Sequence, residues 1–435
     1  MLTLIVTTYL ALGTAYAALT PKWEVPDEPA HYNYIAHLAE NYSFPILQMG
    51  DYPHEYLEEI KAAKFPDHMS IAPIRYESYQ PPLYYLLAAI VYKATGSLAL
   101  NQQVVFLRLF SVALGCLLLL VAYRLVKEVF PSDEVLALAT TAFVATVPMH
   151  IAMTAAINND TLAELILSLL LLLAIKRLKD NIAPWRYTLL GGILLGLGLL
   201  TKTTVYPAIL FIAMAEVARW RLKRMDGNRF SWFPFVSLLA LSTLSSFWWF
   251  LRNVLAYGDF DLFGWKRHDA IVVGQPRTAE WVARFGTAKV AREFALTTFK
   301  SFWAQFGWMG ILIDERIYLM LFLLCALAGL GLLLFSVKNL VNRGLLSAHQ
   351  RWALVLLAMA FLLTFASHLW YNLKFVQHQG RYLFPAIVPI GLFFVIGLRE
   401  LMAREHERLL LGLLFLGLMG LDALCLFGFI IPYFR

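Results

Sequence analysis

Long apolar segments recur along the whole chain and are separated by shorter polar stretches. A helix needs about 20 apolar residues to cross the hydrocarbon core of a bilayer, and most of these segments approach or reach that length. They cover residues 2–20, 82–96, 104–126, 135–156, 161–175, 186–201, 204–219, 231–251, 317–337, 352–371, 383–398 and 409–431. Because the chain is also 60% hydrophobic and only 15% charged, the pattern predicts an all-α integral membrane protein.

One apolar segment, residues 82–96, is predicted not to cross the membrane. It begins at the Pro81-Pro82 pair, is shorter than most of the others, and carries three tyrosines and Lys93. This composition is typical of a helix that lies along the membrane surface. Its removal leaves about 11 transmembrane helices.

With eleven spans, the basic residues gather on one side of the membrane. Nearly half of the 36 lysines and arginines fall in five short loops, residues 124–134, 176–186, 219–229, 338–351 and 399–408. The positive-inside rule places such loops in the cytoplasm. The net charge of +7 therefore reports topology, and no nucleic-acid partner is expected.

The two longest loops then lie outside the cell membrane. They are a first outer loop, residues 21–103, which holds the interfacial segment, and a second outer loop, residues 252–316. We expect one transmembrane domain over residues 1–435. The sequence Ala-Tyr-Ala at 15–17 resembles a signal-peptidase site, but no Lys or Arg precedes Lys22, so we expect the first helix to be retained.

Two adjacent acids, Asp27 and Glu28, follow the first apolar segment directly. Pro26 and Pro29 bracket them and restrict their backbone, and a pair of solvated acids would not need that restriction. Paired carboxylates beside apolar surface shift one another's pKa, which suits proton transfer or metal binding. His31 lies four residues after Asp27, so on a helix it would share a face with it, either as a metal ligand or as an ordinary hydrogen-bonded histidine.

Other polar residues are predicted at the same outer end of the spans. They are Arg108, Asp160, Lys202, Arg252, Arg381 and Tyr382. Asp160 precedes an apolar segment and could simply cap its helix. Lys202 and Arg381 could reach the interface as long cationic side chains, but cations are the minority on the outer side. A bound phosphate would supply their counter-charge, and an arginine would hold it with two hydrogen bonds.

Several motifs resemble those of the GT-C glycosyltransferases, a superfamily that includes the protein O-mannosyltransferases and the bacterial lipid A aminoarabinose transferase. The stretches that carry the resemblance are PDEPAHYNYI at 26–35, YESYQPPLYYLL at 76–87, FLRLFSVALG at 106–115, NNDTLAE at 158–164, GLGLLTKTTVYP at 196–207, FLRN at 250–253, FGWMG at 306–310 and QGRYLFPAIVP at 379–389. Their order and spacing cover most of the chain. In this combination they look like a bacterial branch of multi-span membrane proteins.

The resemblance implies a GT-C-like fold with interfacial helices in the first outer loop and a sugar donor carried on a polyprenyl phosphate. It implies that Asp27 is the general base, with Glu28 beside it, and that Asp160 occupies the second acidic position of the family. Arg108 corresponds to the arginine that opens the second span in the O-mannosyltransferases. Some relatives have Asp-x-Asp where this chain has Asn-Asn-Asp, so a divalent metal ion stays an open question, with Glu28, His31 and Asp160 as candidate ligands.

The sequence thus predicts a membrane glycosyltransferase that acts at the outer leaflet of the cell membrane. It would move a sugar from a polyprenyl-phosphate carrier to a hydroxyl of a glycan, lipid or protein, with inversion at the anomeric carbon. Asp27 would take the proton, while Lys202, Arg252 and Arg381 would stabilise the leaving phosphate. The alternative is a transporter or flippase for a lipid-linked saccharide, which would need an access path on both faces of the membrane.

Overall fold

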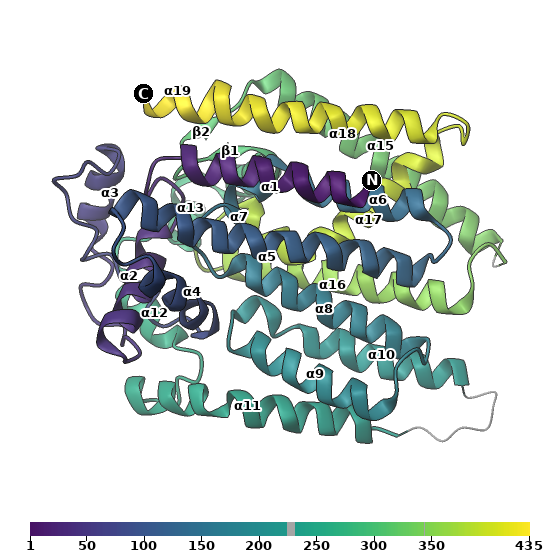
Figure 1. The fold of residues 1–435 in the computed structure, drawn as a ribbon, viewed down its shortest axis with the longest axis horizontal. Helices are drawn as coiled ribbons and strands as arrows, with labels where there is room; N and C mark the ends of the chain where they lie inside the picture. Colours follow the sequence, from purple (N-terminus) through teal and green to yellow (C-terminus); the bar gives the residue numbers. More distant parts are fainter. Residues whose placement is uncertain (224–230, 343) are drawn as a thin grey trace.

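The computed structural model describes residues 1–223, 231–342 and 344–435, and these residues are almost entirely helical. The helices of the main bundle lie side by side (Figure 1), which confirms the predicted all-α membrane fold. They are α1 (Leu2–Leu19), α5 (Leu100–Val129), α6 (Glu134–Ala145), α7 (Pro148–Thr154), α8 (Asp160–Leu178), α9 (Pro184–Leu199), α10 (Ala208–Lys223), α11 (Phe233–Tyr257), α15 (Glu315–Val341), α16 (Ala348–Asn372), α17 (Ile387–Leu401), α18 (Glu407–Leu424) and α19 (Ile431–Phe434), with the π-helical turn η4 (Cys425–Ile430) between the last two.

Seven helices of the described residues are long and apolar enough to cross a membrane, or eight if the bent pair α6–α7 forms one span. Helices α9 and α10 have only 16 residues each, and α8 carries charged residues near both of its ends. The count of about eleven spans is therefore not confirmed and stays a prediction. Helix α15 exposes Leu319, Phe322 and Leu333, as expected for a surface solvated by lipid rather than by water.

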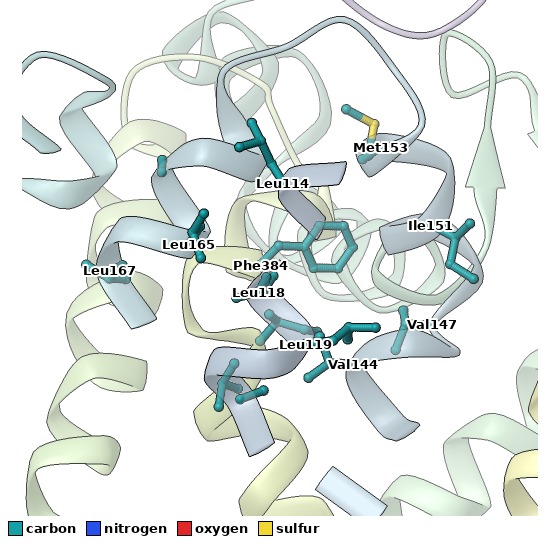
Figure 2. Close-up of a cluster of buried hydrophobic side chains, with 14 of the residues drawn as sticks. Leu114, Leu118, Leu119, Val144, Val147, Ile151, Met153, Leu165, Leu167 and Phe384 are labelled. Atoms are coloured by element: carbon teal, nitrogen blue, oxygen red, sulfur yellow. The ribbon is translucent and has the colours of Figure 1, made fainter. Parts of the chain in front are cut away.

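The chain breaks between α6 and α7, where the helix axis bends by 66°. Pro148 is the first residue of α7 and has no backbone N–H, so it cannot continue the hydrogen-bond ladder of α6. The break lies against a core of buried side chains from α5 to α8, which includes Leu118, Val144, Ile151 and Leu165 (Figure 2). Phe384 joins this core from the 3₁₀ segment η3 (Gly380–Ala386) and so anchors the chain just before α17.

The two long loops meet at one end of the bundle, at the left of Figure 1. They contain α2 (Glu28–Asn41), α3 (His54–Ala62), α4 (Leu83–Ala94), α12 (Trp265–Ile271), α13 (Thr278–Phe285), α14 (Thr287–Trp303) and the antiparallel strands β1 (Gln305–Phe306) and β2 (Ile311–Leu312). The 12 residues of α4 span about 18 Å, whereas the hydrocarbon core is about 30 Å thick. This length agrees with the predicted interfacial position of residues 82–96.

Basic loops lie at the opposite end of the bundle, beside the N-terminus. Residues 124–134, 338–342, 344–351 and 399–408 all lie there (Figure 1). Most of the basic loop at 219–229 lies outside the described residues. The separation of long loops from basic loops agrees with the predicted topology, and which end faces the cytoplasm stays a prediction.

Cysteine labelling tests this orientation. The variants Glu59→Cys and Ala288→Cys, at exposed positions in the two long loops, are expected to react with a membrane-impermeant thiol reagent added to intact cells. The variants His349→Cys and Glu405→Cys, at exposed positions of the other end, should react only after lysis. The background has Cys116, Cys325 and Cys425, which are all free thiols, replaced by serine. Reaction of the His349→Cys variant in intact cells would reverse the predicted orientation.

Candidate active site

An ion pair joins the first outer loop to the segment before α17. The Arg381 Nη2 atom donates to the Asp27 Oδ2 atom at 2.5 Å, and the Tyr76 hydroxyl donates to Asp27 Oδ1 at 2.8 Å. The side chain of Asp27 is 24% exposed and that of Arg381 is 6% exposed. Two residues that are 354 positions apart in the sequence thus meet at the loop-rich end of the bundle, as the sequence predicts.

The backbone places Asp27 in a conformation that few residues adopt. Asp27 is the N-cap of α2 and has φ 68°, in the left-handed region. Asp and Asn tolerate this region better than other non-glycine residues. Pro29 then occupies the first turn of α2, where its missing N–H costs no hydrogen bond. The turn projects the carboxylate away from the helix toward Arg381.

The second outer loop holds Arg381 in place through its neighbour Gly380. The backbone N–H of Gly380 donates to the Ser301 hydroxyl of α14 at 2.7 Å. A β-carbon at Gly380 would lie 2.2 Å from the Thr298 carbonyl oxygen and 2.3 Å from the Phe302 nitrogen. Only glycine therefore allows this close approach, and α14 fixes the position of the arginine that follows.

A second ion pair lies close to the first. The Lys202 Nζ atom, between α9 and the 3₁₀ turn η1 (Thr203–Val205), is 2.6 Å from the Asp160 Oδ1 atom at the start of α8. Arg381 is near enough to act electrostatically on Asp160 as well. Four of the predicted site residues are thus brought together. The side chains of Lys202 and Asp160 are 13% and 20% exposed, so the site is enclosed but reachable.

The carboxyl of Asp27 is held in its charged form. Burial alone would raise its pKa, but the adjacent Arg381 guanidinium, together with the hydrogen bonds from Arg381 and Tyr76, lowers it to about 2. A carboxylate of this kind is a weak base while Arg381 remains its partner.

Glu28 and Arg108 form a buried pair whose polar atoms are occupied. The Arg108 Nε and Nη2 atoms donate to the two carboxylate oxygens of Glu28 at 2.7 and 2.6 Å. Arg108 also donates to three backbone carbonyls at the end of α1, and Glu28 accepts from the backbone N–H groups of Trp23 and Ile157. The two side chains are 1% and 0% exposed. This geometry favours a structural role over the substrate contact predicted for Arg108 and the catalytic role predicted for Glu28.

The candidate metal ligands do not form a metal site. Among the described residues, no group of three or more His, Cys, Asp or Glu side chains could hold a metal ion. Glu28 binds Arg108, Asp160 binds Lys202, and the His31 Nδ1 atom lies 2.8 Å from the Tyr85 hydroxyl. Burial lowers the pKa of His31 to about 3, so its imidazole is neutral. This donor set does not fit a divalent ion.

Arg252 and Tyr382 are the two remaining residues of the predicted site. Arg252, on α11, donates to Asn253, Tyr257 and the Pro45 carbonyl, and stacks over Trp249. These contacts tie α11 to the first outer loop rather than to the phosphate site predicted for this arginine. The Arg381 guanidinium lies over the ring of Tyr382, with 5.4 Å between Cζ and the ring centroid.

The sequence analysis missed one acid of the site, Glu77. It follows Tyr76, the residue that donates to Asp27, and lies within electrostatic range of Asp27, Lys202 and Arg381. We call Asp27, Glu77, Asp160, Lys202 and Arg381 the charged cluster. The signal for Glu77 in the sequence is an acid between two tyrosines in the motif YESYQPP.

Comparison with protein families gives a match over residues 62–390, to the family described as "Predicted membrane protein (DUF2142)". This range includes Glu77, Asp160, Lys202 and Arg381. The chain belongs to the DUF2142 family. No curated protein matches this DUF2142 chain by sequence.

Solved structures show what fold this DUF2142 protein has. The oligosaccharyltransferase of Archaeoglobus fulgidus, in a complex with Zn and sulfate, overlays with a TM-score of 0.53 at 15% identity, covering 97% of this chain and 53% of that one. AglB of the same organism, with an inhibitory peptide and a dolichol-phosphate, gives 0.51 at 16% identity, covering 98% and 54%. The DUF2142 chain thus spans about half the length of these enzymes. The predicted GT-C-like fold is confirmed.

A third relative of lower similarity is ArnT of Cupriavidus metallidurans, bound to undecaprenyl phosphate. It overlays with a TM-score of 0.45 at 14% identity, covering 94% of this chain and 77% of that one.

Proposed function

We propose that this protein is a membrane glycosyltransferase that takes a sugar from a polyprenyl-phosphate carrier and transfers it to an acceptor hydroxyl at the outer face of the membrane. The observation that carries the proposal is the pair of neighbouring ion pairs, Asp27–Arg381 and Asp160–Lys202, at the loop-rich end of the bundle. The fold shared with an oligosaccharyltransferase that binds dolichol-phosphate supports it.

The two cations have the chemistry that a lipid phosphate needs. The planar guanidinium of Arg381 can donate hydrogen bonds to two phosphate oxygens, and the ammonium of Lys202 adds a second positive charge. On donor binding, each cation exchanges its carboxylate for the phosphate. As the bond between the sugar and the phosphate breaks, negative charge grows on the phosphate oxygens, so cations already held in place stabilise the transition state more than the ground state.

A carboxylate is needed for the proton of the acceptor. Asp27 is the base that the sequence predicts, and the phosphate would release it by drawing Arg381 away. The acceptor oxygen then attacks the anomeric carbon on the face opposite the leaving phosphate. A single displacement of this kind inverts the anomeric configuration and needs no covalent nucleophile.

The direct test is turnover of synthetic polyprenyl-phosphate sugars by the purified protein in vesicles, with a cell-envelope extract as the acceptor pool. We expect release of polyprenyl phosphate, measured by mass spectrometry, together with a gain of sugar mass in the extract. A flippase would instead move the intact lipid between leaflets without release. Movement without release, over a panel of donors, would contradict the proposed function.

Lys202 provides a graded prediction. Lys202→Ala is expected to raise KM for the donor and to lower kcat/KM by about 10- to 100-fold, because a hydrogen bond to a charged group contributes about 1.5–3 kcal/mol. Lys202→Arg should retain most activity if the charge alone matters. The matched control is Lys127→Ala, which removes a lysine 3.2 Å from Glu134 at the other end of the bundle and should leave kcat/KM unchanged. Equal kinetics for the Lys202→Ala and Lys127→Ala variants would remove Lys202 from the site.

A further inference from the structure

Glu77 has a carboxylate oxygen that the protein leaves free. Within the described ranges, its buried Oε2 atom has no hydrogen-bond partner. The other acids of the charged cluster have direct cation partners: Asp27 binds Arg381 and Tyr76, and Asp160 binds Lys202. A buried polar atom without a partner is costly and marks a place where a ligand group can bind.

The surroundings of Glu77 are charged on several sides. Asp27, Lys202 and Arg381 act on it electrostatically. Four tyrosines also lie within electrostatic range of Glu77, and they are Tyr76, Tyr79, Tyr85 and Tyr371. These groups come from the first outer loop, the α9–η1 connection, α16 and the segment before α17. Glu77 therefore faces the region where we place the phosphate.

We propose that Glu77, through its free Oε2 atom, is the general base that takes the proton of the acceptor hydroxyl, and that Asp27 positions Arg381. This inference rests on the proposed glycosyl transfer and changes which carboxylate receives the proton. Asp27 can act as a base only after it loses Arg381. Glu77 can accept a proton without the loss of any existing contact to Oε2.

The step balances in atoms and charge. The acceptor O–H proton passes to Glu77 Oε2 as the acceptor oxygen forms its bond to the anomeric carbon. The bond from that carbon to the phosphate oxygen breaks, its electron pair stays on the phosphate, and polyprenyl phosphate leaves. One negative charge is neutralised on Glu77 while one is gained on the phosphate, so the net charge of the enclosed site stays constant.

The environment also matches the basicity of Glu77 to this task. Burial, followed by the like charge of Asp27, raises the pKa of Glu77 to about 7, against the opposing effects of Lys202, Gln80 and Arg381. A general base is most effective when its pKa lies near the working pH. A bound phosphate adds another negative charge and would raise this pKa further.

The pH profile of the unaltered protein is the first test, with release of polyprenyl phosphate from a synthetic polyprenyl-phosphate sugar as the readout. A base must be deprotonated to act, so kcat/KM should rise with pH through about 7 or slightly above. The expected loss between pH 7.5 and pH 5.5 is about 20-fold or more. If Asp27, with its pKa of about 2, is the base, kcat/KM should be flat over this interval, and that profile would overturn the proposal.

Variants separate Glu77 from its neighbours. Glu77→Gln keeps the shape of the side chain and cannot accept the proton, so turnover should fall by about 10²–10⁴ with donor binding kept, and the residual activity should lose its dependence on pH. Asp27→Asn should slow turnover and keep that dependence. The matched control is Glu24→Gln, since Glu24 lies in the same loop, is buried, and also has a pKa raised to about 7, first by burial. The Glu24→Gln variant should keep the rise of kcat/KM with pH.

The outcomes distinguish this inference from the proposed function. If the unaltered protein releases no polyprenyl phosphate from any donor, the glycosyltransferase proposal is refuted, and the proposed role of Glu77 as the base is refuted as well. The second outcome is that the unaltered protein releases polyprenyl phosphate and that Glu77→Gln has the same turnover rate and pH profile. In that case the proposed function stands and Glu77 is not the base. Retention of the pH-dependent rise in Glu77→Gln, at a lower rate, would likewise refute the assignment.

Discussion

Replacement of Arg381 by alanine is expected to lower turnover of a polyprenyl-phosphate sugar by about 10²–10³ and to weaken donor binding. Loss of one preorganised group that stabilises developing negative charge has an effect of this size in other enzymes. The phosphate is charged before the reaction and gains charge as the bond breaks, so both KM and kcat should change. Initial rates of polyprenyl phosphate release over a range of donor concentrations separate the two.

The Arg381→Lys variant tests what Arg381 contributes beyond its positive charge. Arg381→Lys should give intermediate turnover, because lysine supplies a charge without the planar fork. The matched control is Arg75→Ala, which removes an arginine 3.4 Å from Asp51 in the first outer loop, where the Arg75 side chain is 54% exposed. We expect it to behave like the unaltered protein. Full activity in Arg381→Lys would argue against a two-point contact with the phosphate.

Arg108→Ala is expected to destabilise the protein by about 3–5 kcal/mol, because it leaves the Glu28 carboxylate buried without its cation. The side chain of Glu28 is fully buried, and Arg108 also satisfies carbonyls of Ala17, Thr20 and Pro21. The variant should therefore unfold at a much lower temperature in detergent, measured by tryptophan fluorescence.

Lys22→Ala is the control for this prediction. Lys22 lies 2.6 Å from Asp67, whose side chain is 88% exposed. An exposed pair of this kind contributes little to stability, because water and salt screen it, so the change in unfolding temperature should be small. The double variant Arg108→Met with Glu28→Met should recover only part of the loss, since the N–H groups of Trp23 and Ile157 lose their acceptor. Similar unfolding temperatures for Arg108→Ala and Lys22→Ala would refute a structural role for the buried pair.

Hydrophobic periodicity and charge predicted the helices, the interfacial segment and the end of the bundle where polar residues meet. These features depend on local composition and on the membrane, which acts on each segment separately. The bend at Pro148 was missed within the apolar segment 135–156, because proline in a membrane helix can either kink it or be accommodated by its neighbours.

Pairings between distant residues could not be read from the sequence in the same way. Asp27 and Glu28 are adjacent, yet one binds Arg381 and the other Arg108, and only the three-dimensional arrangement separates these partners. The predicted membrane depth of Arg252 places it with the phosphate-binding cations, whereas its side chain donates to the Pro45 carbonyl. Glu77 was overlooked because an acid in a long polar loop resembles any solvated residue until its burial is known.

The contact between α15 and α17 sets the register of the helix that follows Arg381. A β-carbon on Gly331 would lie 1.8 Å from the Gly397 carbonyl oxygen, so the two backbones touch there and cannot slide past one another. Arg381 lies in η3, and α17 begins at Ile387, 10 residues before Gly397, which corresponds to about 15 Å along an α-helix. The number of residues in α17 before Gly397 therefore sets the position of the segment that carries Arg381. Insertion or deletion of a single residue between Ile387 and Gly397 would rotate the start of α17, and the segment with Arg381 that precedes it, by about 100° around the helix axis and displace it by about 1.5 Å, so this stretch must keep its length even where its side chains could vary.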